Sequence, residues 1–150
     1  MDLDATAVRN LELIKNMRDG SKRGTLLDVL DFTSTSMGAR KLRNWIECPL
    51  LDLSQIRSRQ EAVGELLTNV QMRGNLQDKL KAIFDLERIV SRIEVGSANA
   101  RDLVSLRSSL AVLPEIKSLL RYCNSKLFTA VMRRCTFASG AVYYFAGSNC

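Results

Sequence analysis

The sequence contains no histidine, and its few cysteines do not form metal-binding pairs. Four of the 150 residues are cysteine, at positions 48, 123, 135 and 150, and no two of them make a Cys-x-x-Cys pair. Imidazole is the usual proton carrier near neutral pH and a common zinc ligand, so its absence excludes a Ser-His triad and the histidine-containing zinc sites. Since isolated cysteines lack zinc-site spacing as well, we expect free thiols and no metal site in this chain.

Long hydrophobic runs are also missing. No apolar stretch approaches the roughly 18 residues that a membrane-spanning helix needs. Asp2 and Asp4 stand where a secretory signal would carry lysine or arginine. Hydrophobic residues make up 46% and charged residues 25% of the chain, which is the mixture of an ordinary soluble globular protein. The sequence therefore predicts a cytoplasmic protein with no membrane association.

Motifs for nucleotide chemistry and for acid-base catalysis are not apparent. A P-loop needs the spacing GxxxxGK[ST], because backbone amides and a lysine must converge on the phosphates. GSKRGT at Gly20 to Thr25 is too short, and its lysine is in the wrong place. The carboxylates are spread singly among arginines and lysines rather than clustered. This pattern predicts no catalytic residue and no cofactor-binding residue in this chain, and it favours structural ion pairs.

Apolar residues recur at helical spacing along most of the chain. Ser34 or Thr35 is suited to cap a helix through Glu47, and Asp52 to open the next one. Gly96 is the expected left-handed end of a helix, and Asn99 the expected cap of another. The fold class is therefore mainly α, a helical bundle with short connections. A brief strand at residues 11–14 and a new helical turn at Pro114 are two further expectations, and a final helix is expected over 125–134.

The segment TSTSMGARKLRNWIECPL, residues 33–50, allows two interpretations. Its charged residues Arg40, Lys41 and Arg43 mimic a DNA-reading helix that follows a tight turn. Its apolar stripe instead favours a helix packed in a core, through Met37, Leu42, Trp45 and Ile46.

Positive charge gathers in the last third of the chain. Residues 101–150 carry seven Lys/Arg against two acids, whereas the preceding thirds are nearly balanced. An independent basic helical module that binds DNA nonspecifically is therefore an alternative function. Its candidate phosphate contacts are Arg121, Lys126, Arg133 and Arg134.

Four ordered blocks resemble the core, or lever, domain of the bacterial MutS family of DNA mismatch-repair ATPases. They are DLDATAVRNLEL from Asp2, GTLLDVLDFTSTSMGARKLRNWIECPL from Gly24, RSRQEAVGELL from Arg57, and FDLERIVSRIEVGSANARDLVSLRSSLAVLPEIKSLL from Phe84. The resemblance covers roughly residues 2–134 and implies the N-terminal half of that domain. It further implies that the chain is a truncated fragment without enzymatic activity of its own. In intact members of the family, the corresponding segment would relay the DNA-bound state of a clamp and the nucleotide state of an ATPase to one another.

The resemblance also implies which partners and contacts to expect. ATP, magnesium, mismatched DNA and a second MutS subunit would be bound only by the intact protein. Within this chain the expected function of charged residues is to join helices, and the candidates are Arg40, Asp85, Arg88, Arg92, Arg101 and Asp102.

The last 16 residues depart from the family. CTFASGAVYYFAGSNC, residues 135–150, contains no charged residue and has an aromatic cluster. An abrupt loss of all charge is typical of translation in a wrong reading frame, so we divide the chain into a MutS-like part, 1–134, and a divergent tail, 135–150, interpreted as an out-of-frame product. A third hypothesis for the function is a helical adaptor that binds a protein partner through this apolar tail.

Overall fold

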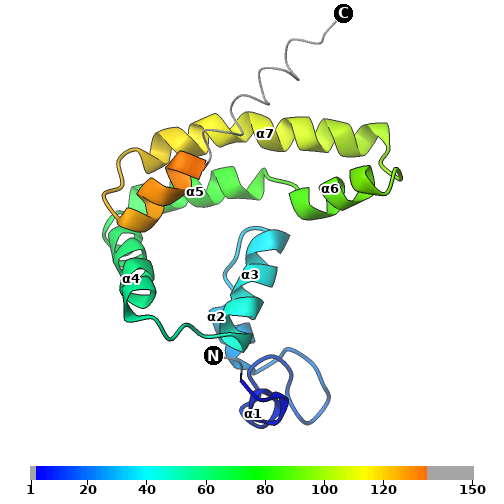
Figure 1. The fold of residues 1–150 in the computed structure, drawn as a ribbon, viewed down its shortest axis with the longest axis vertical. Helices are drawn as coiled ribbons and strands as arrows, with labels where there is room; N and C mark the ends of the chain where they lie inside the picture. The colour runs from blue at the N-terminus through cyan, green and yellow to red at the C-terminus, as the bar shows by residue number, and fades with distance from the viewer. Residues whose placement is uncertain (1–2, 135–150) are drawn as a thin grey trace, which may run out of the picture. The chain divides into compact units, whose positions relative to one another are not determined.

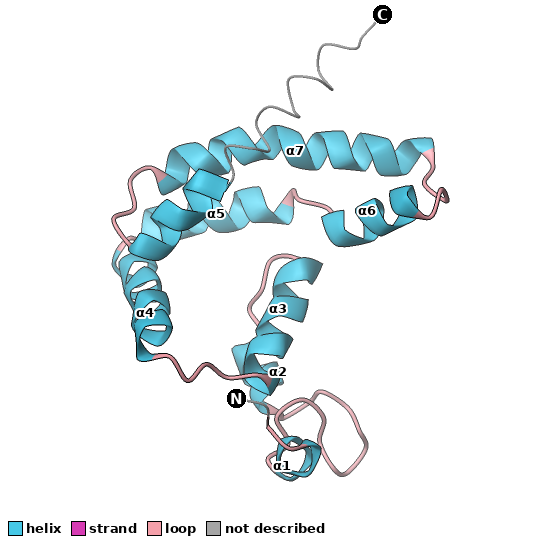
Figure 2. Ribbon diagram, in the orientation of Figure 1, coloured by secondary structure: helices cyan, strands magenta, loops and turns pink. Residues whose placement is uncertain are grey.

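The computed structural model describes residues 3–134, and this range consists of helices, turns and loops without a strand (Figure 2). The helices, in order along the chain (Figure 1), are α1 (Ala5–Asn10), α2 (Leu26–Leu30), α3 (Ser36–Glu47), α4 (Leu53–Thr68), α5 (Val70–Lys81), α6 (Leu86–Glu94) and α7 (Ala100–Leu120), and residues 126–134 are also helical. The mainly helical fold predicted from the sequence is confirmed.

The chain forms two compact units, each described by itself. Unit 1 comprises residues 1–56 and unit 2 comprises residues 57–150. The uncharged tail, 135–150, which we interpreted as an out-of-frame product, lies outside the described residues. Among the helices of residues 3–134, none has the combination of length and apolar character that would let it traverse a bilayer.

The prediction of a short strand at residues 11–14 is wrong, because this segment folds back on α1 instead. The Leu13 amide donates to the Val8 carbonyl at 3.1 Å, and Glu12 adopts a positive φ of 47°. The Glu12 carboxylate then accepts a hydrogen bond from the Met17 amide at 2.6 Å. A strand needs a partner strand along its edge. Here the Leu13 amide is used within the turn, and the Leu13 carbonyl accepts a hydrogen bond from the Leu27 amide of α2 at 3.0 Å.

Helix α3 begins where the sequence indicates. The Thr35 hydroxyl accepts a hydrogen bond from the Gly38 amide at 2.9 Å, the usual N-cap arrangement. A Cβ added at Gly38 would come within 3.0 Å of that hydroxyl, so the glycine leaves room for the cap. The assignment of Trp45 to the core is wrong: its side chain is 38% exposed, and no residue of α3 is fully buried. Unit 1 by itself has too few helices to enclose both sides of α3.

Helix α7 runs through Pro114 without a break, so the predicted new turn at that residue is wrong. Proline removes one intrahelical hydrogen bond, which usually kinks or ends a helix. Pro114 lies on the exposed side of α7. Ile116 and Leu120, just beyond the proline, are buried and hold the helix against the rest of unit 2.

The core of unit 2 forms between α7 and the segments on either side of it in the sequence. Its buried members are Met72 of α5, Ile116 and Leu120 of α7, and Cys123 of the following turn. Half-buried apolar side chains surround them, contributed by α4, α5, α7, the helix 126–134 and, for Ile83, the connection between α5 and α6: Leu66, Leu76, Leu80, Ile83, Val112, Phe128 and Met132. In Figure 1, α7 lies along α5 and then along α6, so one helix organises the unit.

Candidate functional site

An ion pair joins α6 to α7 near the turn that connects them. Arg92 Nη1 lies 2.6 Å from Asp102 Oδ1. The Asp102 side chain is 11% exposed, whereas that of Arg92 is 51% exposed. Since one partner is largely desolvated, the pair contributes more than a fully exposed one, about 1–2 kcal/mol. The structure thus brings together two of the six residues proposed from the sequence to join helices.

Asp102 has a second function at the start of α7. Its other carboxylate oxygen accepts a hydrogen bond from the Asn99 amide at 3.2 Å, while the Asn99 side chain accepts one from the Asp102 amide at 2.9 Å. This reciprocal arrangement is a capping box, and the negative charge also favours the N-terminal end of the helix. One carboxylate therefore fixes the first turn of α7 and binds α6 to it.

A buried serine joins α7 to the connection between α5 and α6. The Ser109 side chain is fully buried, accepts a hydrogen bond from the Phe84 amide at 3.0 Å and donates one to the Ser105 carbonyl at 2.8 Å. The sequence analysis missed this residue. A usable signal was its spacing of seven residues from both Asp102 and Ile116, which places all three on one face of the helix.

A third contact joins α5 to α7 on the far side of Ser109. The Lys79 ammonium pairs with the Glu115 carboxylate, both about half exposed. Sequence analysis did not identify this pair, because its members are 36 residues apart and belong to different helices. Polar contacts therefore hold α7 against its two neighbours at several points along its length.

The other residues proposed to join helices lie at the starts of α6 and α7 and on α3. Arg88 and Asp85 pair with each other at 3.6 Å within the first turn of α6, so this contact is local. The Asp85 carboxylate also caps α6 by accepting from the Arg88 amide. Arg101 is exposed at the start of α7, and Arg40 is exposed on α3 in the other unit. Arg43 of α3, a candidate DNA reader, pairs with Glu47 of the same helix at 3.1 Å.

A glutamate of α4 binds the start of the helix 126–134. Glu65 Oε1 accepts a hydrogen bond from the Asn124 amide at 2.5 Å, and Glu65 Oε2 accepts one from the Ser125 amide at 3.0 Å. Burial and then the charge of Glu65 raise the pKa of the neighbouring Cys123 thiol. A carboxylate at this position satisfies two amides that the helix itself leaves unpaired. Glu65 thereby connects α4 to a segment about 60 residues later in the chain.

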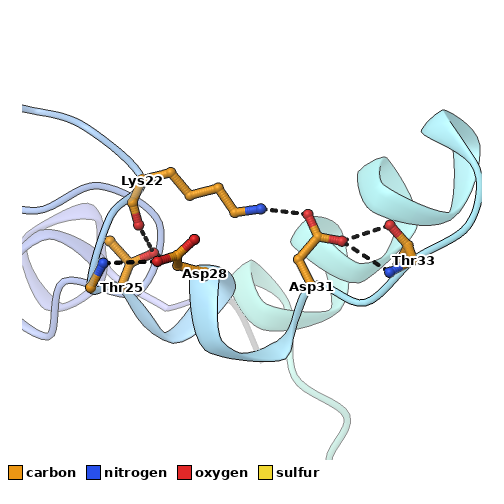
Figure 3. A network of polar contacts seen from close by, with 6 residues as sticks. Lys22, Thr25, Asp28, Asp31 and Thr33 are labelled. Carbon is orange, nitrogen blue, oxygen red and sulfur yellow. Dashed lines mark hydrogen bonds and ion pairs between the residues drawn. The ribbon is translucent and has the colours of Figure 1, made fainter.

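Unit 1 has its own polar network, centred on Asp31 (Figure 3). Lys22 Nζ lies 2.5 Å from Asp31 Oδ2, and the Thr33 hydroxyl donates to Asp31 Oδ1 at 2.6 Å. The hydrogen bond from Lys22, followed by that from Thr33, lowers the pKa of Asp31 from 3.8 to about 2. The network ties the loop before α2 to the connection after it.

The Asp31 network predicts a loss of stability of unit 1 in acid. The pKa is lower in the folded chain, so the contribution of Asp31 is complete above about pH 4 and disappears as the pH falls through about 2. Replacing Asp31 with asparagine should lower the unfolding midpoint at pH 7 and flatten its decline between pH 4 and 2. Fluorescence of Trp45, the single tryptophan, reports this unit. The control is Asp78→Asn, which replaces an exposed aspartate of unit 2. An unfolding midpoint that declines equally between pH 4 and 2 in wild type and in Asp31→Asn would contradict the prediction.

The Gly20–Thr25 loop does not fit a nucleotide phosphate. Its Lys22 ammonium pairs with Asp31, and four of its amides already donate to acceptors of the same unit: those of Ser21, Arg23, Gly24 and Thr25. A phosphate cradle needs such amides to converge on an external anion. Among residues 3–134 there is also no group of three or more side chains of the kind that hold a metal ion.

A basic face lies along the helix 126–134. Three of the four candidate phosphate contacts, Lys126, Arg133 and Arg134, line one shallow hollow of about 490 Å³ together with Asn124, Thr129 and Ala130. All three cations are exposed. The fourth candidate, Arg121, is exposed in the turn after α7 and does not line the hollow. We call the six lining residues the basic face.

The sequence of this chain is similar to those of known proteins. The family model described as MutS domain III matches residues 6–138. The chain is 55% identical over 120 residues to the DNA mismatch repair protein MutS of Symbiobacterium thermophilum and 54% identical over 120 residues to that of Pelotomaculum thermopropionicum. It is 44% identical over 128 residues to the protein of the same name from Clostridium botulinum strain Okra. These matches cover 80–85% of this chain and 14% of each relative.

Proposed function

Because the chain belongs to the MutS family through its domain III, we propose that it is a mechanical element of a DNA mismatch repair protein. The chain spans 14% of the length of the relatives it matches. Its role in the intact protein is mechanical: it couples the DNA-bound state of the part that holds DNA to the nucleotide state of the part that hydrolyses ATP. By itself it has no enzymatic activity and does not bind mismatched DNA tightly.

One observation carries the proposal: α7 is a continuous strut joined by side chains to two other helices. Its 21 residues span about 31 Å at 1.5 Å per residue. Asp102 near its start is bound to α6, and Glu115 near its end is bound to α5. Coupling between distant sites requires an element that moves as a unit between alternative packings, and the continuity of α7 supports the first part of that requirement, movement as a unit.

The remaining features of the proposal concern the intact protein. There, other segments bind ATP and magnesium, mismatched DNA and a second MutS subunit, and the whole protein is cytoplasmic. The residues of this chain that join its helices supply packing and ion pairs rather than ligands for a nucleotide or a metal. MutS-like sequence extends over residues 1–134 as one segment of the core domain.

The relay is tested in a chimaera with an intact relative. Residues 6–134 of this chain replace the matching segment of the Symbiobacterium thermophilum protein, with or without Asp102→Asn. The measured quantity is the factor by which ATP changes affinity for a mismatched duplex. We expect Asp102→Asn to reduce this factor by roughly tenfold, within the usual range of coupling energies. Duplex affinity without ATP, and ATP hydrolysis without DNA, should change less than twofold, because neither site contains Asp102.

The matched control is Asp78→Asn, which breaks an ion pair with Lys81 inside α5. Both members of that pair are exposed, and the pair joins no second helix. An equal loss of coupling in the two variants would mean that the α6–α7 ion pair has no special function in the relay. Loss of duplex affinity and of hydrolysis together with coupling would indicate a folding defect instead, which circular dichroism of the chimaera identifies.

A further inference from the structure

From the geometry of the helix 126–134, we infer that the basic face is a nonspecific contact for the phosphodiester backbone of DNA. This inference goes beyond the relay and does not depend on it, since it concerns the outer surface of one helix. The ligand is a double-stranded nucleic acid backbone, contacted without regard to base sequence or to mismatches.

The arrangement of the three cations supports a polyanion rather than one small anion. Lys126 and Arg133 are separated by two helical turns, about 11 Å along the axis, and Arg134 lies beside Arg133. The hollow between them is lined by Thr129 and Ala130, so no bulky side chain fills it. A row of separated positive charges beside an open groove suits successive phosphates of one strand.

The local charge balance of this face also favours an anionic ligand. Its hollow is lined by three cations and no carboxylate. Four cations elsewhere in the described part of unit 2 are bound in ion pairs: Lys79 with Glu115, Lys81 with Asp78, Arg88 with Asp85, and Arg92 with Asp102. For the three cations of the basic face, no ion pair with another described residue is found. They are therefore available to an external anion.

The opposite side of the helix argues against a lipid surface. Phe128 and Met132 point into unit 2 and pack against its core. A helix that binds in the plane of a membrane needs an apolar face free to enter the lipid, and here that face is already covered. Glu65, a carboxylate at the helix start, accepts hydrogen bonds from the Asn124 and Ser125 amides.

The test uses the full chain and a short fluorescent DNA duplex, with anisotropy measured at increasing salt. Three phosphate contacts predict a slope of about −2.7 for log affinity against log salt, or about 40-fold weaker binding at 200 mM than at 50 mM salt. In the variant Lys126→Gln, Arg133→Gln, Arg134→Gln, we expect the slope to approach zero. Duplexes with and without a mismatch should bind equally.

The matched control replaces three exposed cations of the same unit that lie outside the basic face, as Lys81→Gln, Arg101→Gln, Arg107→Gln. It has the same net charge as the first variant and should retain most of the slope. Equal slopes in the two variants would overturn the inference, as would binding to anionic phosphatidylserine vesicles without binding to the duplex. Circular dichroism establishes that both variants are folded. A preference for the mismatched duplex would contradict the inference as well, because contacts to the phosphodiester backbone do not distinguish a mismatch.

Discussion

Truncating Leu120 to alanine should lower the free energy of unfolding of unit 2 by about 3 kcal/mol. Leu120 is 5% exposed and lies with Met72, Ile116 and Cys123 at the centre of the core. Removing its side chain takes away buried apolar surface and leaves a cavity that the surrounding helices can fill only in part. Leu120 is the most buried leucine of α7.

The measurement is chemical denaturation followed by circular dichroism, with hydrogen exchange to assign the loss to unit 2. Leu103→Ala on the same helix is the control, because that side chain is 49% exposed. We expect the control to cost about 1 kcal/mol or less, since it removes a partly solvated side chain. Equal effects at the two positions would show that the core does not centre on Leu120.

Replacing Glu65 with alanine should destabilise unit 2 by about 2 kcal/mol, mainly by releasing the helix 126–134. The carboxylate accepts hydrogen bonds from the Asn124 and Ser125 amides, and hydrogen bonds to a charged group are stronger than neutral ones. Without it, both amides at the helix start lose their acceptor, and α4 loses its connection to this helix. Hydrogen exchange should rise first in residues 124–134.

A second readout separates the charge of Glu65 from its shape. Burial raises the pKa of the Cys123 thiol, and the Glu65 charge raises it further. In Glu65→Gln the pKa of Cys123 should therefore fall, and its alkylation at a fixed pH near 8 should become faster. Mass spectrometry of the Cys123 peptide distinguishes it from the other cysteines. Glu61→Gln, one turn earlier and exposed, is the control; unchanged Cys123 reactivity in Glu65→Gln would contradict the assignment.

Local chemistry made the helix boundaries predictable. Thr35 and Asn99 cap α3 and α7 as their residue types indicate, and Gly96 has a positive φ of 72° after α6. Each of these features involves residues within three or four positions of one another, so short sequence patterns contain all the information. The ordered family blocks likewise needed only the sequence, and the match of residues 6–138 to MutS domain III confirms them.

Predictions that required knowledge of the surroundings were less successful. The apolar stripe of α3 suggested a buried Trp45, but periodicity shows only that a helix has an apolar face, not that another element covers it. Pro114 suggested an interruption, but packing of Ile116 and Leu120 beyond it holds α7 together. In both cases tertiary contacts decided what a local preference left open.

The sequence by itself determined the helical class, most helix starts and ends, and the family, because these depend on neighbouring residues or on ordered motifs. Only the tertiary structure decided which polar groups that are far apart in the sequence meet. Glu65 reaches Ser125 across 60 residues, and Ser109 reaches Phe84 across 25. A side chain can bind a partner this far along the chain only after the helices pack, and the packing depends on how all apolar faces of a unit combine. The partners of these side chains therefore could not be read from the neighbouring sequence.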